Sequence, residues 1–472
     1  MNKGLINILK NFSYTLISNL ISIIISILVI LIVPKLIGVE DYGYWQLYLF
    51  YASYIGFLHF GWNDGIYLRY GGAEYEKLDK SLFFSQFYML LSSQTVIAII
   101  IYALSTFFVE NADRAFIFSM VALSLLITNM RWMLVFTLQA TNRIKEYAGI
   151  TVIGRVLYVL IIIALLIMGY KEYKLMIVAD IIARFVSLMF AIYTCRDFIF
   201  RKISNFYFSF KEMAENISAG SKLMFATIAS MLIIGVVRFG IERTWDVSTF
   251  GKVSLTLSAS NMLMLFINAV GIVVFPILRR TNERNLPEIY TTMRDFLMLV
   301  LLGLLIIYHP VKEILSAWLP KYADSLRYMA LLFPICVYEG KMALLINTYL
   351  KTLRKETLML KINVISLLVS FVTTFIFSRI FHELNILIVS IVFLLGFRSI
   401  LAEILLSRIL KVSLLKDIIL EVVMTIIFVC TGWFIMSWTT ILIYGFAYIL
   451  YLVIKKKDLK MTVSKMKGLI KK

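Results

Sequence analysis

Long apolar runs alternate with short polar segments along the whole chain. Each run is close to the roughly 20 residues that a transmembrane helix needs, and fourteen such runs can be placed. They lie near 12–33, 44–62, 82–109, 115–138, 148–169 and 175–195, then near 222–242, 253–275, 295–310, 326–350, 357–380 and 384–407, and finally near 418–436 and 439–454. The pattern predicts an all-α polytopic membrane protein with about 14 transmembrane helices.

The runs form two series of six, and short matches suggest that one series repeats the other. Val39-Glu-Asp-Tyr-Gly43 and Val247-Ser-Thr-Phe-Gly251 are 208 positions apart, and the Lys-Glu pairs at 145–146 and 355–356 are 210 apart. Because six is even, both halves enter the membrane in the same sense, which predicts a parallel repeat about an axis along the membrane normal. The expected organisation is a first lobe over 1–195, an amphipathic cytoplasmic linker over 196–221, a second lobe over 222–410, an additional helix pair over 411–454 and a basic tail over 455–472.

Composition supports a membrane protein, and the basic residues orient it. The chain has 472 residues, of which 61% are hydrophobic and 16% charged, whereas a soluble domain is about 45–50% apolar and about 25% charged. The net charge of +19 would suggest nucleic acid in a soluble protein. Here 30 of the Lys and Arg residues fall in predicted cytoplasmic segments and 10 in external ones. This bias predicts cytoplasmic termini and no nucleic-acid partner.

Catalytic and metal-binding motifs are missing from the sequence. The longest external loop, near 311–325, is too short for a catalytic domain, and no Gly-rich phosphate loop of the ATPase type is present. The histidines, His59, His309 and His382, are far apart, and the three cysteines are odd in number. We therefore expect a protein that is not an enzyme and has no cofactor, metal site or disulfide framework.

Charged residues inside the apolar runs are the main candidates for function. Seven cations and three carboxylates were assigned to the spans, a sum of +4: Arg131, Arg155, Arg184, Arg238, Lys341, Lys361 and Arg398, with Asp180, Glu339 and Glu403. An ion at the bilayer centre costs at least about 2.5–3.5 kcal/mol, so such residues usually face the bundle interior or a water-filled cavity. The candidates for a basic substrate cavity are Arg131, Arg155, Arg184, Arg398 and Lys341.

Several of these charges also have purely structural interpretations. Arg238 and Lys361 lie about one turn from span ends and could extend to the interface. Asp180 and Arg184 are spaced i,i+4, which suits an internal ion pair.

Glu339 and Lys341 are spaced i,i+2 and point to different faces, so each needs a partner elsewhere. Arg184 and Arg398 occupy the sixth and twelfth spans, and a parallel repeat predicts that they line one shared cavity.

The excess of arginine over lysine indicates the class of substrate. A guanidinium group stays charged when buried and presents a planar fork to phosphate oxygens. The cavity therefore favours an anionic, phosphate-bearing substrate. Coupling to H⁺ or Na⁺ would require carboxylates, and Asp180, Glu339 and Glu403 are the candidates.

Two segments near the N-terminus resemble bacterial polysaccharide flippases. Val33-Pro-Lys-Leu-Ile-Gly-Val-Glu-Asp-Tyr-Gly-Tyr-Trp45 is similar to their first external loop, and Phe60-Gly-Trp-Asn-Asp-Gly-Ile-Tyr-Leu-Arg-Tyr70 is similar to the end of their second span. Gly38 and Gly43 can also be explained by a tight turn, and Glu40 and Asp41 by the favourable placement of acids at a helix start. The resemblance is to O-antigen flippases of the multidrug, oligosaccharidyl-lipid and polysaccharide exporter superfamily.

This resemblance implies a transporter in the bacterial cytoplasmic (inner) membrane, with two parallel six-helix lobes around a central cavity and a further helix pair. Its expected activity is translocation of undecaprenyl-pyrophosphate-linked oligosaccharide, by alternating access, for O-antigen or another surface polysaccharide. Membrane lipids and other polysaccharide assembly proteins are the further expected partners. Two alternatives remain open: a cation-coupled multidrug exporter of the same superfamily, and a membrane-embedded polysaccharide polymerase or ligase.

Overall fold

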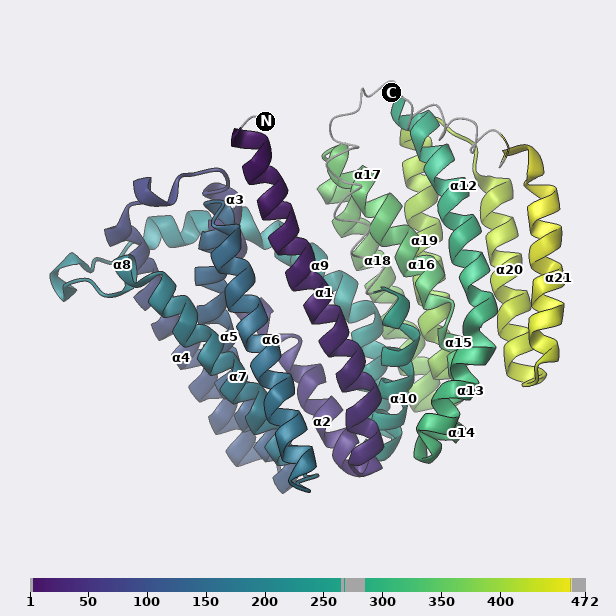
Figure 1. Ribbon diagram of the computed structural model, residues 1–472, viewed down its shortest axis with the longest axis horizontal. Helices are drawn as coiled ribbons and strands as arrows, with labels where there is room; N and C mark the ends of the chain where they lie inside the picture. Colours follow the sequence, from purple (N-terminus) through teal and green to yellow (C-terminus); the bar gives the residue numbers. More distant parts are fainter. Residues whose placement is uncertain (1–2, 265–266, 268–284, 459, 461–472) are drawn as a thin grey trace. The chain divides into compact units, whose positions relative to one another are not determined.

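The computed structural model describes residues 3–264, 267, 285–458 and 460. Within these ranges the chain is helical and contains no strand. It forms two units, one over Met1–Ile228 and the other over Ala229–Lys472. Figure 1 shows the helices of both units. The all-helical membrane fold predicted from the apolar runs is confirmed.

The N-terminal unit contains six long or interrupted spans and the start of a seventh. Its helices are α1 (Lys3–Leu36), α2 (Val39–Ala52), α3 (Trp62–Arg69), α4 (Lys80–Phe108), α5 (Ala112–Ala140), α6 (Ile144–Ile167), α7 (Tyr173–Thr194), the short α8 (Arg196–Ile199) and the first part of α9 (Phe210–Thr244). Helix α9 has 35 residues and no break near 222. The predicted boundary between linker and second lobe therefore lies inside a helix.

The C-terminal unit begins within α9 and contains the remaining helices. They are α10 (Val247–Ser260), α12 (Leu286–Leu304), α13 (Tyr308–Trp318), α14 (Ala323–Leu326), α15 (Met329–Leu332), α16 (Ile335–Lys341), α17 (Asn347–Thr352), α18 (Glu356–Phe375), α19 (Leu384–Leu410), α20 (Leu415–Phe434) and α21 (Thr439–Ile454). A π-helical turn at Met342–Ile346 joins α16 to α17 and another at Ile376–Ile380 follows α18. Part of the predicted eighth span, 253–275, lies outside the described residues.

Eleven helices or helix groups in the described ranges are long and apolar enough to cross a membrane, and α21 is a shorter apolar helix. Most predicted runs coincide with helices, but α1, α9 and α12 begin about nine to twelve residues before the runs predicted for them. The exact number of fourteen spans and the side on which the termini lie stay predictions.

Each unit is built around one central helix. In the most apolar window of α5, 72% of the residues are buried, against 22% in α4. In the C-terminal unit the helix group Met329–Thr352 has 89% of its window buried. These are the predicted fourth and tenth spans, so the equivalent member of each series occupies the core of its unit.

Local geometry supports the internal repeat. Helices α2 and α10 both have 14 residues and begin at Val39 and Val247, the start of the sequence match. The turns after α5 and α17 are also alike, because Asn142 and Arg354 both adopt a positive φ. Asn142 and Arg354 are 212 positions apart, whereas the Lys-Glu pairs at 145–146 and 355–356 are 210 apart. The sequence match is therefore shifted by two residues relative to the matching turns.

The second span is interrupted, and glycines let it pack against the start of α9. After α2 the chain forms a 3₁₀ turn at Ile55–His59, and Phe60 and Gly61 then adopt left-handed conformations before α3. A Cβ at Gly65 would lie 1.8 Å from the carbonyl oxygen of Asn216, so only glycine fits there. This contact fixes the first turns of α9 on the N-terminal unit.

Candidate functional site

A cavity of about 460 Å³ lies within the N-terminal unit. Its wall comes from the end of α2 and the following residues, and from α5, α6 and α7. Most of its charge comes from three arginines, Arg131 on α5, Arg155 on α6 and Arg184 on α7, and Asp180 on α7 is the carboxylate in the wall. The structure thus brings three of the five predicted basic residues together at one site.

Arg184 is held in place by the hydrogen bonds that it donates to α7, its own helix, and to α5. Its Nε donates to Asp180 Oδ2 over 2.6 Å, and its Nη1 donates to Thr128 Oγ1 over 3.1 Å. Tyr48 donates its hydroxyl to the same Asp180 oxygen, also over 2.6 Å. The predicted i,i+4 ion pair is confirmed. It fixes the direction of one guanidinium group and satisfies the charge of Asp180.

Arg131 and Arg155 have no such partner. Among the described residues neither makes an ion pair or a hydrogen bond with the protein. Arg155 is exposed and Arg131 is partly buried, and both contribute to the cavity wall. Three guanidinium groups against one carboxylate leave two positive charges uncompensated in the cavity. Such an excess is expected to bind an anion.

Close packing of α6 on α7 brings the arginines into the same cavity. A Cβ at Gly154 would lie only 3.0 Å from the Cβ of Ser187, so a larger residue would have to displace Ser187. Ser187 also donates a hydrogen bond to the carbonyl oxygen of Ile150 over 2.9 Å. Because Arg155 follows Gly154 directly, this contact sets the separation between Arg155 and the Asp180–Arg184 pair.

Aromatic and neutral polar side chains complete the wall. Trp132, Tyr147 and Tyr158 contribute ring surfaces, and Gln139 contributes an amide. Trp132 also packs against Phe136, with ring centroids 5.6 Å apart. The cavity therefore offers aromatic faces and hydrogen-bonding groups beside the guanidinium groups.

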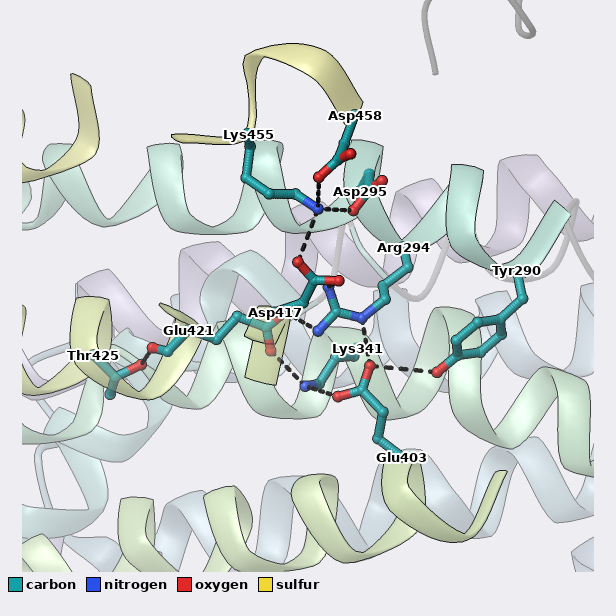
Figure 2. A network of polar contacts seen from close by, with 10 residues as sticks. All are labelled: Tyr290, Arg294, Asp295, Lys341, Glu403, Asp417, Glu421, Thr425, Lys455 and Asp458. Carbon is teal, nitrogen blue, oxygen red and sulfur yellow. Dashed lines mark hydrogen bonds and ion pairs between the residues drawn. The ribbon is translucent and has the colours of Figure 1, made fainter. Parts of the chain in front are cut away.

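The C-terminal unit contains a different charge cluster, the buried network of Lys341, Glu403, Arg294 and Glu421 (Figure 2). Lys341 Nζ lies 2.7 Å from a carboxylate oxygen of both Glu403 and Glu421. Arg294 Nε is 2.6 Å from Glu403, and its Nη2 contacts Glu421. All four side chains are at most 2% exposed. Two cations and two carboxylates give this network no net charge.

A second group of ion pairs continues from the network toward the end of α21. Lys455 Nζ lies 2.8 Å from Asp295, 2.9 Å from Asp417 and 2.8 Å from Asp458. These contacts and those of Glu421 join α20 and α21 to α12, α16 and α19 within the unit (Figure 2). Ion pairs thus connect the additional helix pair to the rest of the C-terminal unit.

Of the remaining charged candidates, Arg398, Glu339 and Arg238 have partners within the protein. Arg398 is 3% exposed at its side chain and its Nη1 donates to Glu339 Oε1 over 2.8 Å. The expectation that Glu339 and Lys341 need separate partners is confirmed. Arg238 donates to Ser254 Oγ over 3.0 Å, and Lys361 is exposed. The shared cavity expected for Arg184 and Arg398 stays a prediction.

Sequence reasoning missed Arg294 and Glu421. The predicted span begins at 295 and therefore places Arg294 in a cytoplasmic segment, but α12 begins at Leu286, with a proline in its first turn. Glu421 lies inside the predicted 418–436 span and was left out of the +4 sum. Glu421 could have been found, because it stands inside a long apolar run, whereas the polar residues before Arg294 make that residue look like part of a loop.

Comparisons with known proteins identify the fold. No family model and no curated protein matches the sequence. The structure is similar to an inward-facing multidrug resistance MATE family transporter of the MOP superfamily, at 11% identity and a TM-score of 0.61 over 83% of this chain and 98% of the other. It is also similar to the lipid II flippase MurJ in an inward closed conformation, at 14% identity and a TM-score of 0.61 over 95% and 99%.

A third similar structure is a MOP superfamily transporter from Pyrococcus furiosus, described as having a binding pocket of reversed polarity. It is 12% identical with a TM-score of 0.51, over 85% of this chain and 96% of the other. At these identities the likeness concerns the fold alone. The chain has the fold of MOP superfamily transporters, a class of multi-pass membrane proteins.

Proposed function

We propose that this protein is a flippase that moves undecaprenyl-pyrophosphate-linked oligosaccharide across the bacterial cytoplasmic membrane for O-antigen or another surface polysaccharide. The observation that carries the proposal is the positive excess of the N-terminal cavity, provided by Arg131, Arg155 and Arg184. The fold, which a lipid II flippase shares, supports transport of a lipid-linked substrate rather than catalysis.

A pyrophosphate group gives the cavity a physical role. Unpaired charge is very costly in hydrocarbon, so the headgroup needs compensating cations during its passage. Arginines suit this role because they stay charged and bind phosphate oxygens through two parallel hydrogen bonds. Arg131 and Arg155 have no carboxylate that competes with the substrate, and Arg184 is pre-oriented by Asp180 and Thr128. The polyprenyl tail would remain in the lipid.

Alternating access would expose the site to each side of the membrane in turn. Where the membrane potential is negative inside, outward movement of negative charge is favoured by about 2.3 kcal/mol per charge per 100 mV. This electrical term could provide part of the driving force. A coupling ion, H⁺ or Na⁺, would have to compete with Arg184 for Asp180, or with Arg398 for Glu339.

Lys341 and Glu403 do not belong to the proposed site. Each is fully buried and bound to two opposite charges of the C-terminal network. Their charge is compensated within the protein, so we assign them a structural role. The same reasoning makes Arg398 a weaker candidate than the three arginines of the N-terminal cavity.

A cation-coupled multidrug exporter shares the fold and is the main alternative. An organic cation would be repelled by the excess of two positive charges in the cavity. Asp180, which could attract it, is bound to Arg184 and Tyr48. The polarity of the cavity therefore favours the anionic substrate.

The test is a leaflet assay in cells that lack the gene. Lipid-linked oligosaccharide should accumulate on the cytoplasmic face, wild-type protein should clear it, and Arg131→Ala/Arg155→Ala should not. Lys361→Ala, an exposed cation outside the cavity, is the matched control. Normal clearance by the double variant would refute the proposal. A change in drug resistance with unaltered glycan would support the exporter, and single units left on the outer face would indicate a polymerase.

A further inference from the structure

A row of exposed apolar side chains lies in the loop between α8 and α9 and at the first residue of α9. This aromatic strip consists of Phe200, Ile203, Tyr207, Phe208 and Phe210, which are 71%, 87%, 44%, 69% and 58% exposed. The loop stands out from the edge of the N-terminal bundle beside α8 (Figure 1). Five large apolar side chains on one loop exceed what scattered surface residues account for, so the strip calls for a partner.

Hydrogen bonds to α4 hold the loop that carries the strip. Gln86 donates its amide to the backbone carbonyl of Ser209 over 3.1 Å, and the Ser85 hydroxyl accepts from the backbone N–H of Tyr207 over 3.1 Å. Arg201 donates to Ser81 Oγ over 2.9 Å. These contacts keep the backbone of the loop at the beginning of α4, where this span enters the membrane.

Ring stacking extends the strip outward from α4. Phe84 on α4 packs edge-on against Phe206, with centroids 6.5 Å apart, and Phe206 packs against Phe208 at 5.1 Å. Phe208 and Phe210 then stack nearly parallel, at 5.5 Å and 5°. The rings support one another and form a continuous apolar edge rather than separate exposed residues.

Basic residues accompany the strip. Four cations lie in or beside the loop: Arg196, Arg201, Lys202 and Lys211. The segment 196–211 contains one acid, Asp197, which lies 2.5 Å from Lys80 and accepts a hydrogen bond from Tyr75. Its charge is therefore already compensated, and the cations give the loop a positive surface. Aromatic rings combined with basic groups are the pattern of a segment that lies in a membrane interface.

We propose that the aromatic strip is a docking surface for anionic lipids. Its rings enter the boundary between headgroups and acyl chains, and Arg201, Lys202 and Lys211 bind lipid phosphates. The leaflet is the one at the start of α4, which the charge bias predicts to be cytoplasmic. The strip leads directly into α9, whose first turns pack on α3 through Gly65. Docking would hold this end of the N-terminal unit at a fixed depth in the membrane.

The test places a fluorescent label on the strip of the full-length protein in nanodiscs. Phe208→Cys is labelled with bimane after Cys430→Ser removes the one exposed native cysteine. Ile203→Cys, which makes no stacking contact among the described residues, is a second reporter in case the ring substitution alters the loop. Glu76→Cys, on the preceding loop and 81% exposed at its side chain, is the matched control.

Nitroxide-labelled lipid should quench both strip labels, and aqueous iodide should quench the Glu76 label. Adding phosphatidylglycerol to phosphatidylcholine should increase the lipid quenching of the strip. Arg201→Gln/Lys202→Gln should reduce the affinity of the strip for phosphatidylglycerol by about fivefold for each cation removed. The increase in lipid quenching on adding phosphatidylglycerol should become correspondingly smaller. Iodide quenching of both strip labels equal to that of the control would overturn the proposal. Lipid quenching that is independent of phosphatidylglycerol would overturn the assignment of anionic lipid.

Discussion

The two units differ in how their charged side chains are compensated. In the C-terminal unit Lys341 and Arg294 are matched by Glu403 and Glu421, and the network is fully buried. In the N-terminal unit three arginines share a cavity with one carboxylate. The difference indicates which charges are structural. The cations of the C-terminal network are neutralised by the protein, and we propose that the N-terminal cations left in excess bind the substrate.

This comparison predicts the largest loss of stability in the C-terminal network. Lys341→Ala would leave two buried carboxylates with a single arginine, which should lower the free energy of unfolding by about 3–5 kcal/mol. Thermal denaturation in detergent would measure the loss. Lys341→Met combined with Glu421→Gln removes one charge of each sign and should recover most of it. A single variant as stable as the wild type would show that the network is not a structural element.

Substitutions in the N-terminal cavity should reduce transport without reducing stability. Arg131→Ala and Arg155→Ala remove repelling charges without breaking an ion pair, so the denaturation midpoint should stay the same or rise. Each lost charged hydrogen bond to substrate is worth about 1.5–3 kcal/mol, so transport should fall by at least about tenfold for each variant. Initial rates in proteoliposomes would measure this. A stability loss as large as that of Lys341→Ala would contradict the distinction between the two clusters.

Arg184 combines both features, because it lies in the cavity wall and is also paired with Asp180. Arg184→Lys keeps the charge but cannot bind Asp180 and Thr128 through two arms of one planar group. We expect transport to fall by about tenfold with little change in the denaturation midpoint. Thr128→Val separates positioning from charge, because it removes the Nη1 acceptor alone. Full activity in both variants would show that the orientation of Arg184 is unimportant.

The smallest difference concerns the starts of the repeated helices α2 and α10. Gly38 gives α2 no side-chain cap, whereas Asp246 Oδ1 accepts a hydrogen bond from the backbone N–H of Thr249 over 2.6 Å. Asp246→Ala should therefore cost about 1 kcal/mol of stability. Ser248→Ala, in the same turn, is the control.

The Asp246 cap also gives a pH dependence. The hydrogen bonds from Thr249 lower the pKa of Asp246 below its ordinary value. The stabilisation is fully present above the unfolded-state pKa of about 3.9 and is lost as the pH falls through the lower folded-state pKa. Wild type and Asp246→Ala should thus converge in acid. A difference that persists at the lowest pH would contradict the cap.

The sequence was sufficient for the all-helical membrane fold and for one internal ion pair. Apolar length places the helices, and i,i+4 spacing predicts Asp180 with Arg184 because both lie on one helix. Long-range pairs such as Lys341 with Glu421 depend on packing between helices that no local pattern encodes. For this reason counting intramembrane charges identified the candidates but could not separate the neutral network from the basic cavity. Arg294 was missed for a different reason. The predicted span begins at 295, so Arg294 falls in a predicted loop, whereas α12 begins at Leu286.

The central claim is that the N-terminal cavity binds a pyrophosphate group. The most direct test measures binding of undecaprenyl pyrophosphate to the purified protein in nanodiscs, with undecaprenyl phosphate for comparison. The account predicts that Arg131→Ala/Arg155→Ala weakens pyrophosphate binding by at least about tenfold and reduces the preference over the monophosphate. It predicts unchanged binding for Lys341→Met/Glu421→Gln. Unaltered binding by the cavity variant, with loss in the network variant, would contradict it.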